Sequence, residues 1–400
     1  MSASTLLTLL TSGADALKNN KRIHLIVGNE ACDADSTIGA LSLSLILAAR
    51  GDINNLVIIV PVISCTRSDW ILRREAGVII KRWIGDNHDA DLIFLDDILS
   101  TSNVTSITLV DHNELTGSLA SFGWSDRVCS IVDHHEDIGA HLNVINRQID
   151  WDTTSIPPRG CGSCCSLLAR DASQLNLLDV PFSIALLSVI ALDCIGFDTL
   201  AGKVTPIDID AVEKLTAVID ASGPTLKELF NELSSLRSDQ KWWLSIPPLD
   251  ALRADYKGFT ARGGLVIGTS ALMISISKWL GTIGTSSSNE RISALHEFAV
   301  KKGLDILVLF SLEGGGDVEN TPSRQLAVCF YNSERGTAAM GAISNVFRQG
   351  GAGESWGLEE ITPSPPTCSD DIKVKVYNQR DVRISRKQIA PRLIEALGNN

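Results

Sequence analysis

Four short apolar runs in this chain each lead into an aspartate. They lie within Ile23–Asp35, Ile107–Glu114, Cys129–Asp137 and Leu186–Asp198. An apolar run of four to six residues that ends in Asp or Asn is typical of a buried parallel strand. The C-terminal end of such a strand faces the crevice where open α/β sheets bind ligands. Three strand ends and one helix end would bring carboxylates and histidines together, which predicts a multi-metal site that acts on phosphate.

The composition is that of an ordinary globular protein, with 44% apolar and 20% charged residues over 400 positions. This length predicts two domains. The net charge of −12 argues against partners such as nucleic acid or an anionic membrane, because proteins that bind them carry a basic excess. The chain has nine cysteines, no secretory leader and no run of the roughly 18 apolar residues that cross a bilayer. We therefore expect a cytoplasmic protein with reduced thiols, and a monomer.

Apolar runs alternate with helical patterns from position 22 to about 200. This alternation indicates an α/β fold with a mostly parallel sheet and helices on both faces. Strands are predicted at HLIV, LVIIV, DLIFL, ITLVD and SIVD, and helices at 36–49 and 69–84. Prolines and a Trp pair break the pattern at 237–250. We predict a first domain over 1–236, a linker over 237–250 and a smaller α/β domain over 251–400.

The turn after the first strand carries Asn29, Asp33 and Asp35. Alternate spacing lets the two carboxylates bind two different cations from one loop, and oxygen ligands suit Mg²⁺ or Mn²⁺. A single Asp-x-Asp is also common in surface loops. Asp111, at the end of ITLV, is a candidate to bridge two metals, although a lone Asp there is equally a helix N-cap or a turn residue.

The Asp133-His134-His135 sequence is a more specific signal, because consecutive side chains at a buried strand end cannot both enter one packed core. One reading is a satisfied core histidine beside an exposed one. The functional reading makes His134 a metal ligand supported by Asp133, with His135 facing the substrate. Asp193 lies in an otherwise apolar helical run, where metal binding would offset the cost of burying a carboxylate.

Gly162 and Ser163 precede a predicted helix. They are either small packing residues or a helix start whose free N–H groups face phosphate. A zinc site at Cys161, Cys164 and Cys165 is not favoured, because no second cysteine pair has zinc spacing.

Taken in order, these motifs resemble the Asp-His-His (DHH) phosphoesterase superfamily, in the branch whose second domain is of the DHHA2 type. The matching segments are GNEACDADS, LRREA, VDHNE, VDHHED, GSCCSLL, ADYKGF, KGLDILVL and SRKQIAP, which cover nearly the whole chain. The likeness is strongest to fungal cytosolic exopolyphosphatases. Family II inorganic pyrophosphatases and prune-type proteins are neighbours in the superfamily.

The resemblance implies two or more divalent ions, Mg²⁺ or Mn²⁺ with Co²⁺ as a further option. On the matching positions, one ion is bound by Asn29, Asp33 and Asp111, and the second by Asp35, Asp111, His134 and Asp193. The catalytic residues would be Asp111, His134 and His135, and the substrate would contact His135, Lys257, Arg386 and Lys387. Asn29 departs from the pyrophosphatase pattern, which has histidine there, and its amide oxygen favours Mg²⁺ over softer ions.

The expected activity is removal of terminal phosphate from inorganic polyphosphate by a water that two metals activate. Seven basic residues against one acid between Lys373 and Arg392 would neutralise a polyanion, although a solvated basic face is equally compatible. An inorganic pyrophosphatase is the first alternative, and a prune-like short-chain polyphosphatase or phosphodiesterase is the second. A non-catalytic interaction module on this fold would be expected to have lost at least one of the acidic or histidine ligands.

Overall fold

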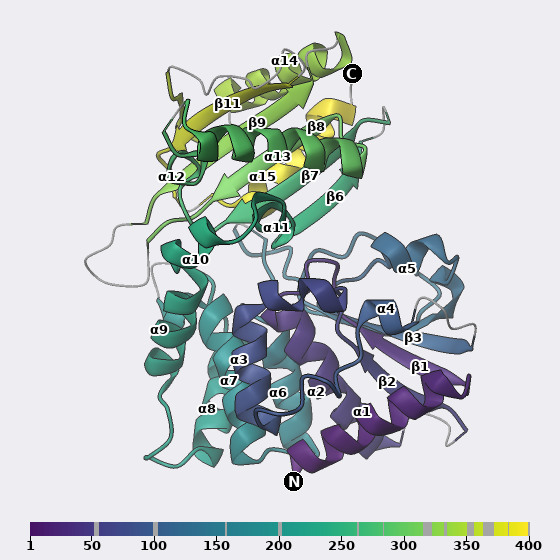
Figure 1. The fold of residues 1–400 in the computed structure, drawn as a ribbon. Coiled ribbons are helices and arrows are strands. Elements are labelled where there is room, and N and C mark those ends of the chain that lie inside the picture. The colour runs from purple at the N-terminus through teal and green to yellow at the C-terminus, as the bar shows by residue number, and fades with distance from the viewer. Residues whose placement is uncertain are drawn as a thin grey trace. The chain divides into compact units, whose positions relative to one another are not determined.

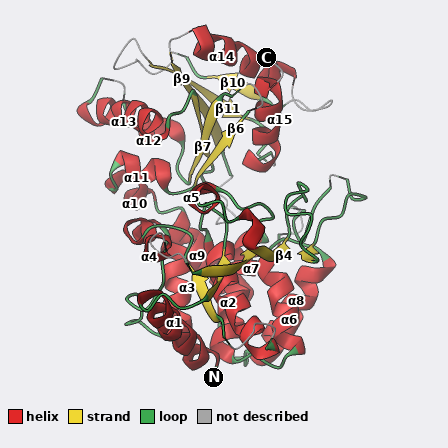
Figure 2. Cartoon of the chain, turned by 90° about the vertical axis from the view of Figure 1, so that its right-hand side faces the viewer, coloured by secondary structure: helices red, strands yellow, loops and turns green. Residues whose placement is uncertain are grey.

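The computed structural model describes all residues except 52–55, 99–102, 157, 199–201, 262–263, 283, 315–321, 332–333, 350–355, 363–371, 383 and 399–400. The chain forms two compact units, Met1–Leu236 and Arg237–Asn400. Each has its own sheet with helices packed around it (Figures 1 and 2). Residues 237–250, where a linker is predicted, carry a short helix and the start of another, and they group with the second unit. No helix in the described part of the chain is long and apolar enough to cross a membrane.

The first unit contains a five-stranded parallel sheet in the order β2-β1-β3-β4-β5. Its strands are β1 (Ile23–Val27), β2 (Ile58–Val62), β3 (Val104–Val110), β4 (Val128–Asp133) and β5 (Asn146–Ile149). Its helices are α1 (Ser2–Lys18), α2 (Ala34–Arg50), η1 (Arg67–Leu72), α3 (Arg74–Ile84), α4 (Leu95–Ile98), α5 (Gly117–Ser121), η2 (Ser125–Arg127), α6 (Cys164–Gln174), α7 (Val180–Asp193), η3 (Ile195–Phe197), α8 (Pro206–Val218) and α9 (Leu226–Arg237).

The second unit contains a six-stranded mixed sheet in the order β10-β11-β9-β8-β7-β6, in which β7 and β8 pair in parallel and the other described neighbours pair antiparallel. Its strands are β6 (Tyr256–Thr260), β7 (Val266–Leu272), β8 (Ile306–Ser311), β9 (Arg324–Tyr331), β10 (Leu358–Glu360) and β11 (Ile372–Gln379). Its helices are α10 (Gln240–Ser245), α11 (Pro248–Arg253), α12 (Ile276–Leu280), α13 (Ser286–Lys302), α14 (Glu334–Gln349) and α15 (Arg386–Gly398). The predicted fold class, an α/β protein with a parallel sheet and a second α/β domain, is confirmed.

Local signals set the ends of α2, the helix that follows the first candidate metal motif. Asp33 is the N-cap, and its side chain accepts a hydrogen bond from Ser36 N. Gly51 ends the helix in the left-handed region, with φ 68°, where a residue without Cβ carries no steric penalty. The same aspartate that caps the helix is therefore placed at the C-terminal edge of the sheet.

Two predictions for the first unit are wrong. DLIFL is not a strand: Phe94 forms one isolated bridge with Ile63, and Phe94 N donates to Asp97 Oδ2 at 2.8 Å. This side-chain bond turns the chain into α4 after one bridge. The helix predicted over 69–84 is two elements, because the backbone of Arg73 leaves helical geometry between η1 and α3.

Buried His24 on β1 makes the stability of the first unit depend on pH. Its ring nitrogens lie 2.6 Å from Ser106 Oγ and 2.9 Å from Thr108 Oγ1 on β3. Burial lowers the pKa of His24 to about 4 from 6.5. Between these two values the unfolded chain binds a proton that the folded chain does not, so falling pH destabilises the fold.

We expect this term to lower the free energy of unfolding by about 2 kcal/mol between pH 7 and pH 5. Other titrating groups also act in that range, so the measurement compares wild type with His24→Gln by denaturant unfolding at both pH values. The variant cannot bind a proton at position 24. The difference in free energy of unfolding between wild type and the variant should therefore shift against wild type by about 2 kcal/mol from pH 7 to pH 5. An advantage of constant size would contradict the prediction.

Candidate metal centre

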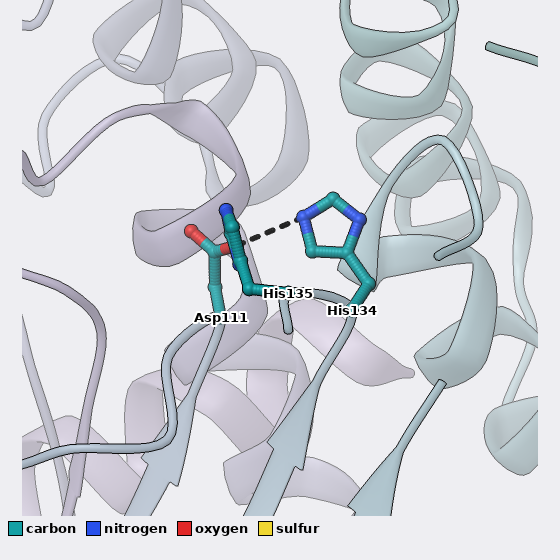
Figure 3. Close-up of side chains that lie close together, drawn as sticks. All are labelled: Asp111, His134 and His135. Atoms are coloured by element: carbon teal, nitrogen blue, oxygen red, sulfur yellow. Dashed lines mark ion pairs between the residues drawn. The ribbon is translucent and has the colours of Figure 1, made fainter. Parts of the chain in front are cut away.

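Asp111, His134 and His135 meet at the C-terminal ends of neighbouring strands. Asp111 follows β3, and the two histidines follow β4. The parallel pairing of these strands places their ends together, and Asp111 N donates to Val132 O at 2.9 Å. Among the described residues, these three form the group whose ligand atoms all lie within 4.8 Å of one another (Figure 3). The sequence prediction that these two motifs converge agrees with this geometry.

Asp111 is the centre of this cluster. It is buried and has a left-handed backbone, with φ 64°. Its Oδ2 accepts hydrogen bonds from Ser36 Oγ at 2.6 Å and from Asn29 Nδ2 at 2.7 Å. Its Oδ1 is buried, accepts no hydrogen bond from the described residues, and lies 3.2 Å from His134 Nε2. Burial, followed by the charge of Asp33, raises the pKa of Asp111 to about 6.

The imidazole of His134 is oriented by a backbone carbonyl. Its Nδ1 donates to Cys161 O at 2.7 Å, since a carbonyl oxygen only accepts. This contact assigns the proton to Nδ1 and leaves Nε2 for a ligand role. Nε2 is the atom that faces Asp111 Oδ1 and lies 3.7 Å from Asp35 Oδ2.

The predicted support of the His134 ring by Asp133 is wrong. Asp133 Oδ1 accepts instead from His135 Nδ1 at 2.9 Å and from the backbone N of His134 at 2.8 Å. Its Oδ2 accepts from Asn113 Nδ2 at 2.6 Å. Burial alone would raise the pKa of Asp133, but the hydrogen bond and charge of His135 lower it below its usual range. The carboxylate therefore orients the His135 ring through its Nδ1. Neither Asn113 nor the Cys161 carbonyl was identified from sequence.

Asp35 is held by the start of α6. Its Oδ1 accepts from Ser163 Oγ and Cys165 N, both at 2.9 Å, and its Oδ2 accepts from Cys164 N at 2.7 Å. The N–H groups of Cys164 and Cys165 at this helix start therefore bind a carboxylate, and Gly162 N, one of the groups predicted to face phosphate, donates to Asp208 Oδ2 at 2.9 Å. Burial, followed by the charge of Asp111, raises the pKa of Asp35 to about 6.

The other predicted ligands lie around this cluster in different ways. Asn29 directs its amide nitrogen to Asp111, while its amide oxygen accepts from Ala31 N at 2.9 Å. A half-turn of the carboxamide would exchange the two atoms. Asp33 is exposed, and its charge raises the pKa values of both Asp111 and Asp35. Asp193 ends α7, and its charge contributes, after burial and Asp35, to the raised pKa of the Cys165 thiol.

The donor set fits a divalent cation. Burial, followed by the charge of neighbouring carboxylates, raises the pKa values of Asp35 and Asp111, and a bound cation would favour the charged form of both. Asp111 Oδ1 is a buried acceptor that lies 3.2 Å from another potential ligand atom, His134 Nε2. Carboxylate oxygens with one imidazole suit Mg²⁺ or Mn²⁺.

In the second unit, the predicted substrate residues lie on two elements, β6 and α15. Lys257 is on β6, and Arg386 begins α15. Arg386 forms an ion pair with Asp255 at 2.7 Å and donates to the carbonyl of the same residue at 2.9 Å. Lys387 is on α15, but its side chain lies outside the described residues. Much of the basic stretch is paired with acids: Lys375 with Glu360, Arg380 with Glu359, and Arg392 with Glu395.

The fold and this cluster define an α/β protein with a candidate divalent-metal centre. Residues 235–396 match the family model of the DHHA2 domain, so the second unit is a DHHA2 domain. Exopolyphosphatase PRUNE1 of Homo sapiens is 27% identical over 96% of this chain and 77% of its own length. The putative exopolyphosphatase of Schizosaccharomyces pombe is 26% identical over 97% of this chain and 94% of its own length. The predicted DHHA2-type second domain is confirmed, and the relatives named exopolyphosphatase are consistent with the predicted superfamily.

The solved exonuclease RecJ bound to manganese aligns over 99% of this chain and 94% of its own, with 13% identity and a TM-score of 0.27. A likeness this slight has no bearing on the fold or the metal.

Proposed function

We propose that this protein is a metal-dependent exopolyphosphatase, a phosphoric anhydride hydrolase that removes terminal phosphate from inorganic polyphosphate. The observation that carries the proposal is the convergence of Asp111, His134 and His135 within 4.8 Å at the ends of β3 and β4. Similarity along nearly the whole chain to proteins named exopolyphosphatase supports the choice of substrate.

The ligands of a cation pair are a further part of the proposal. One cation would be held by Asn29, Asp33 and Asp111, and the other by Asp35, Asp111, His134 and Asp193. When bound, such cations lower the pKa of a shared water and polarise phosphoryl oxygens. Asn29 meets this role only after its carboxamide turns, since its oxygen otherwise accepts from Ala31 N.

The remaining residues bind and orient the substrate. His135, with Nδ1 on Asp133, offers Nε2 to a phosphoryl oxygen. Lys257, Arg386 and Lys387 neutralise phosphates that do not react. Arg386→Gln should raise KM for polyphosphate more than it lowers kcat, because the contact is made in the ground state as well. A variant with unchanged KM would remove Arg386 from the substrate site.

Phosphate release from pyrophosphate, tripolyphosphate and long polyphosphate, measured in parallel, tests the proposed activity. We expect turnover of the polyphosphates to exceed that of pyrophosphate. The reverse order would favour an inorganic pyrophosphatase, and activity restricted to short chains or nucleotides would favour a prune-like enzyme. No release from any substrate with Mg²⁺ would favour a non-catalytic interaction module.

Mg²⁺ should support phosphate release at least as well as Mn²⁺ or Co²⁺ at equal free concentration. The physical reason is that an amide oxygen at Asn29 is a harder donor than the imidazole of pyrophosphatases. Initial rates in metal-buffered solution measure this preference. Rates with Mn²⁺ or Co²⁺ far above the rate with Mg²⁺ would contradict it.

We also propose a cytoplasmic monomer that binds neither nucleic acid nor membrane. The net charge of −12 supports this, because nucleic acid and anionic membranes repel a negatively charged protein. Light scattering of the purified protein and fluorescence imaging of a tagged chain test these points. A stable dimer or a membrane-associated signal would overturn them.

A further inference from the structure

The first turn of α6 decides which oxygen of Asp35 is available to a cation. A carboxylate has about four lone-pair sites, two on each oxygen. Ser163 Oγ and Cys165 N occupy both sites of Oδ1, and Cys164 N occupies one site of Oδ2. One site is left, on Oδ2, the oxygen that lies 3.7 Å from His134 Nε2.

The turn that presents these donors is itself rigidly held. Asp208, fully buried in the first turn of α8, accepts from Gly162 N at 2.9 Å and from Ser166 Oγ at 2.6 Å. A Cβ on Gly162 would approach Cys194 Sγ to less than 3.0 Å, so a larger residue there would force its neighbours to shift. Hydrogen bonds to Asp208 of α8 thus hold the start of α6, which also packs against Cys194, the residue after α7.

We propose that Ser163 is a positioning residue that makes Asp35 a one-oxygen ligand through Oδ2. Its hydroxyl is the only side-chain donor among the three, and it is fully buried. Without it, Oδ1 regains a lone pair that could also bind a cation, and only two N–H bonds, one to each oxygen, orient the carboxylate. The inference rests on the proposed metal centre but not on the identity of the substrate.

The experiment measures Mn²⁺ binding by titration calorimetry in the absence of any substrate. Ser163→Gly removes the hydroxyl at little cost to the helix, because glycine is nearly as good an N-cap as serine. Ser163→Ala removes the same hydroxyl and serves as a second variant. We expect both to weaken Mn²⁺ binding at least about tenfold, the usual effect of losing a group that orients a ligand.

Ser44→Ala is the matched control. Ser44 is also a buried serine, but it lies inside α2 and its hydroxyl donates to Leu41 O at 2.6 Å. This variant should bind Mn²⁺ as wild type does. Wild-type affinity in both Ser163 variants would overturn the inference, as would an equal loss in Ser44→Ala. The proposed function and this inference can fail separately. If the Mn²⁺ affinities follow the expected order but the wild-type protein does not hydrolyse polyphosphate, the proposed function is refuted and this inference stands.

Discussion

Asp111→Asn should abolish phosphate release and leave a folded protein. Asp111 is the proposed ligand of both cations, and loss of metal catalysis costs several kcal/mol of transition-state stabilisation, or roughly 10³-fold in rate. Initial rates of phosphate release from polyphosphate with saturating Mg²⁺ measure the effect. A variant with nearly full turnover would remove Asp111 from the reaction.

The stability of the same variant should not fall, because asparagine satisfies the surrounding hydrogen bonds. Its amide oxygen accepts from Ser36 and Asn29, as Oδ2 of Asp111 does. Its amide nitrogen then faces His134 Nε2, which is an acceptor because Nδ1 holds the proton for Cys161 O. Since burial raises the pKa of Asp111 from 3.8 to about 6, the neutral side chain should stabilise the metal-free protein at pH 7 by up to about 3 kcal/mol.

Asp171→Asn is a suitable control for this variant. Asp171 is also buried, but it lies on α6 and pairs with Arg50 at 2.8 Å. Its replacement should lower the unfolding temperature, because it weakens a partly buried ion pair. Phosphate release should remain within a few-fold of wild type. Asp111→Asn is therefore expected to lose activity and keep its stability, whereas Asp171→Asn should lose stability and keep most of its activity.

Gly160→Ala should damage both stability and activity, although Gly160 itself carries no chemistry. A Cβ there would come within less than 3.0 Å of the carbonyl oxygens of His134 and Asp150. Both obstacles are backbone atoms at the end of the sheet and cannot rotate away. The overlap should cost about 3 kcal/mol of unfolding free energy or more.

The activity loss follows from the neighbouring residue. Cys161 supplies the carbonyl that orients His134, so moving residue 160 displaces the support of a proposed ligand. A loss of about 10- to 100-fold in phosphate release is expected for such a support. Thermal unfolding and initial rates of the same preparation check both effects.

Gly77→Ala controls for the change from glycine to alanine. Gly77 is inside α3, and the nearest atom to its Cβ would be Trp70 Cζ2 at 3.8 Å, an ordinary contact. Alanine should therefore stabilise this helix by up to about 1 kcal/mol. If Gly160→Ala unfolds at the same temperature as wild type, the prediction is wrong. The backbone after β4 would then move away from the added Cβ at little cost.

Some of this structure was predictable because its causes are local. Strands β1, β3 and β4 are buried runs whose apolar residues are contiguous in sequence, and parallel strands end at one edge of a sheet. The structure brings Asp111, His134 and His135 together at that edge. DLIFL has the composition of a strand, but the side chain of Asp97, three residues after Phe94, binds Phe94 N and ends the pairing.

The residues alone determined the α/β class, the parallel order of elements and the candidate ligands, since these depend on periodicity and on which side chains follow each apolar run. Only the tertiary structure decided how the ligands are oriented. Ser163 contacts Asp35, which is 128 positions away in sequence. The group that orients the His134 ring is the backbone carbonyl of Cys161, and a backbone group is the same whatever residue stands there. Hydrogen bonds between distant segments leave no local pattern, because their geometry exists only after the sheet and its helices have packed.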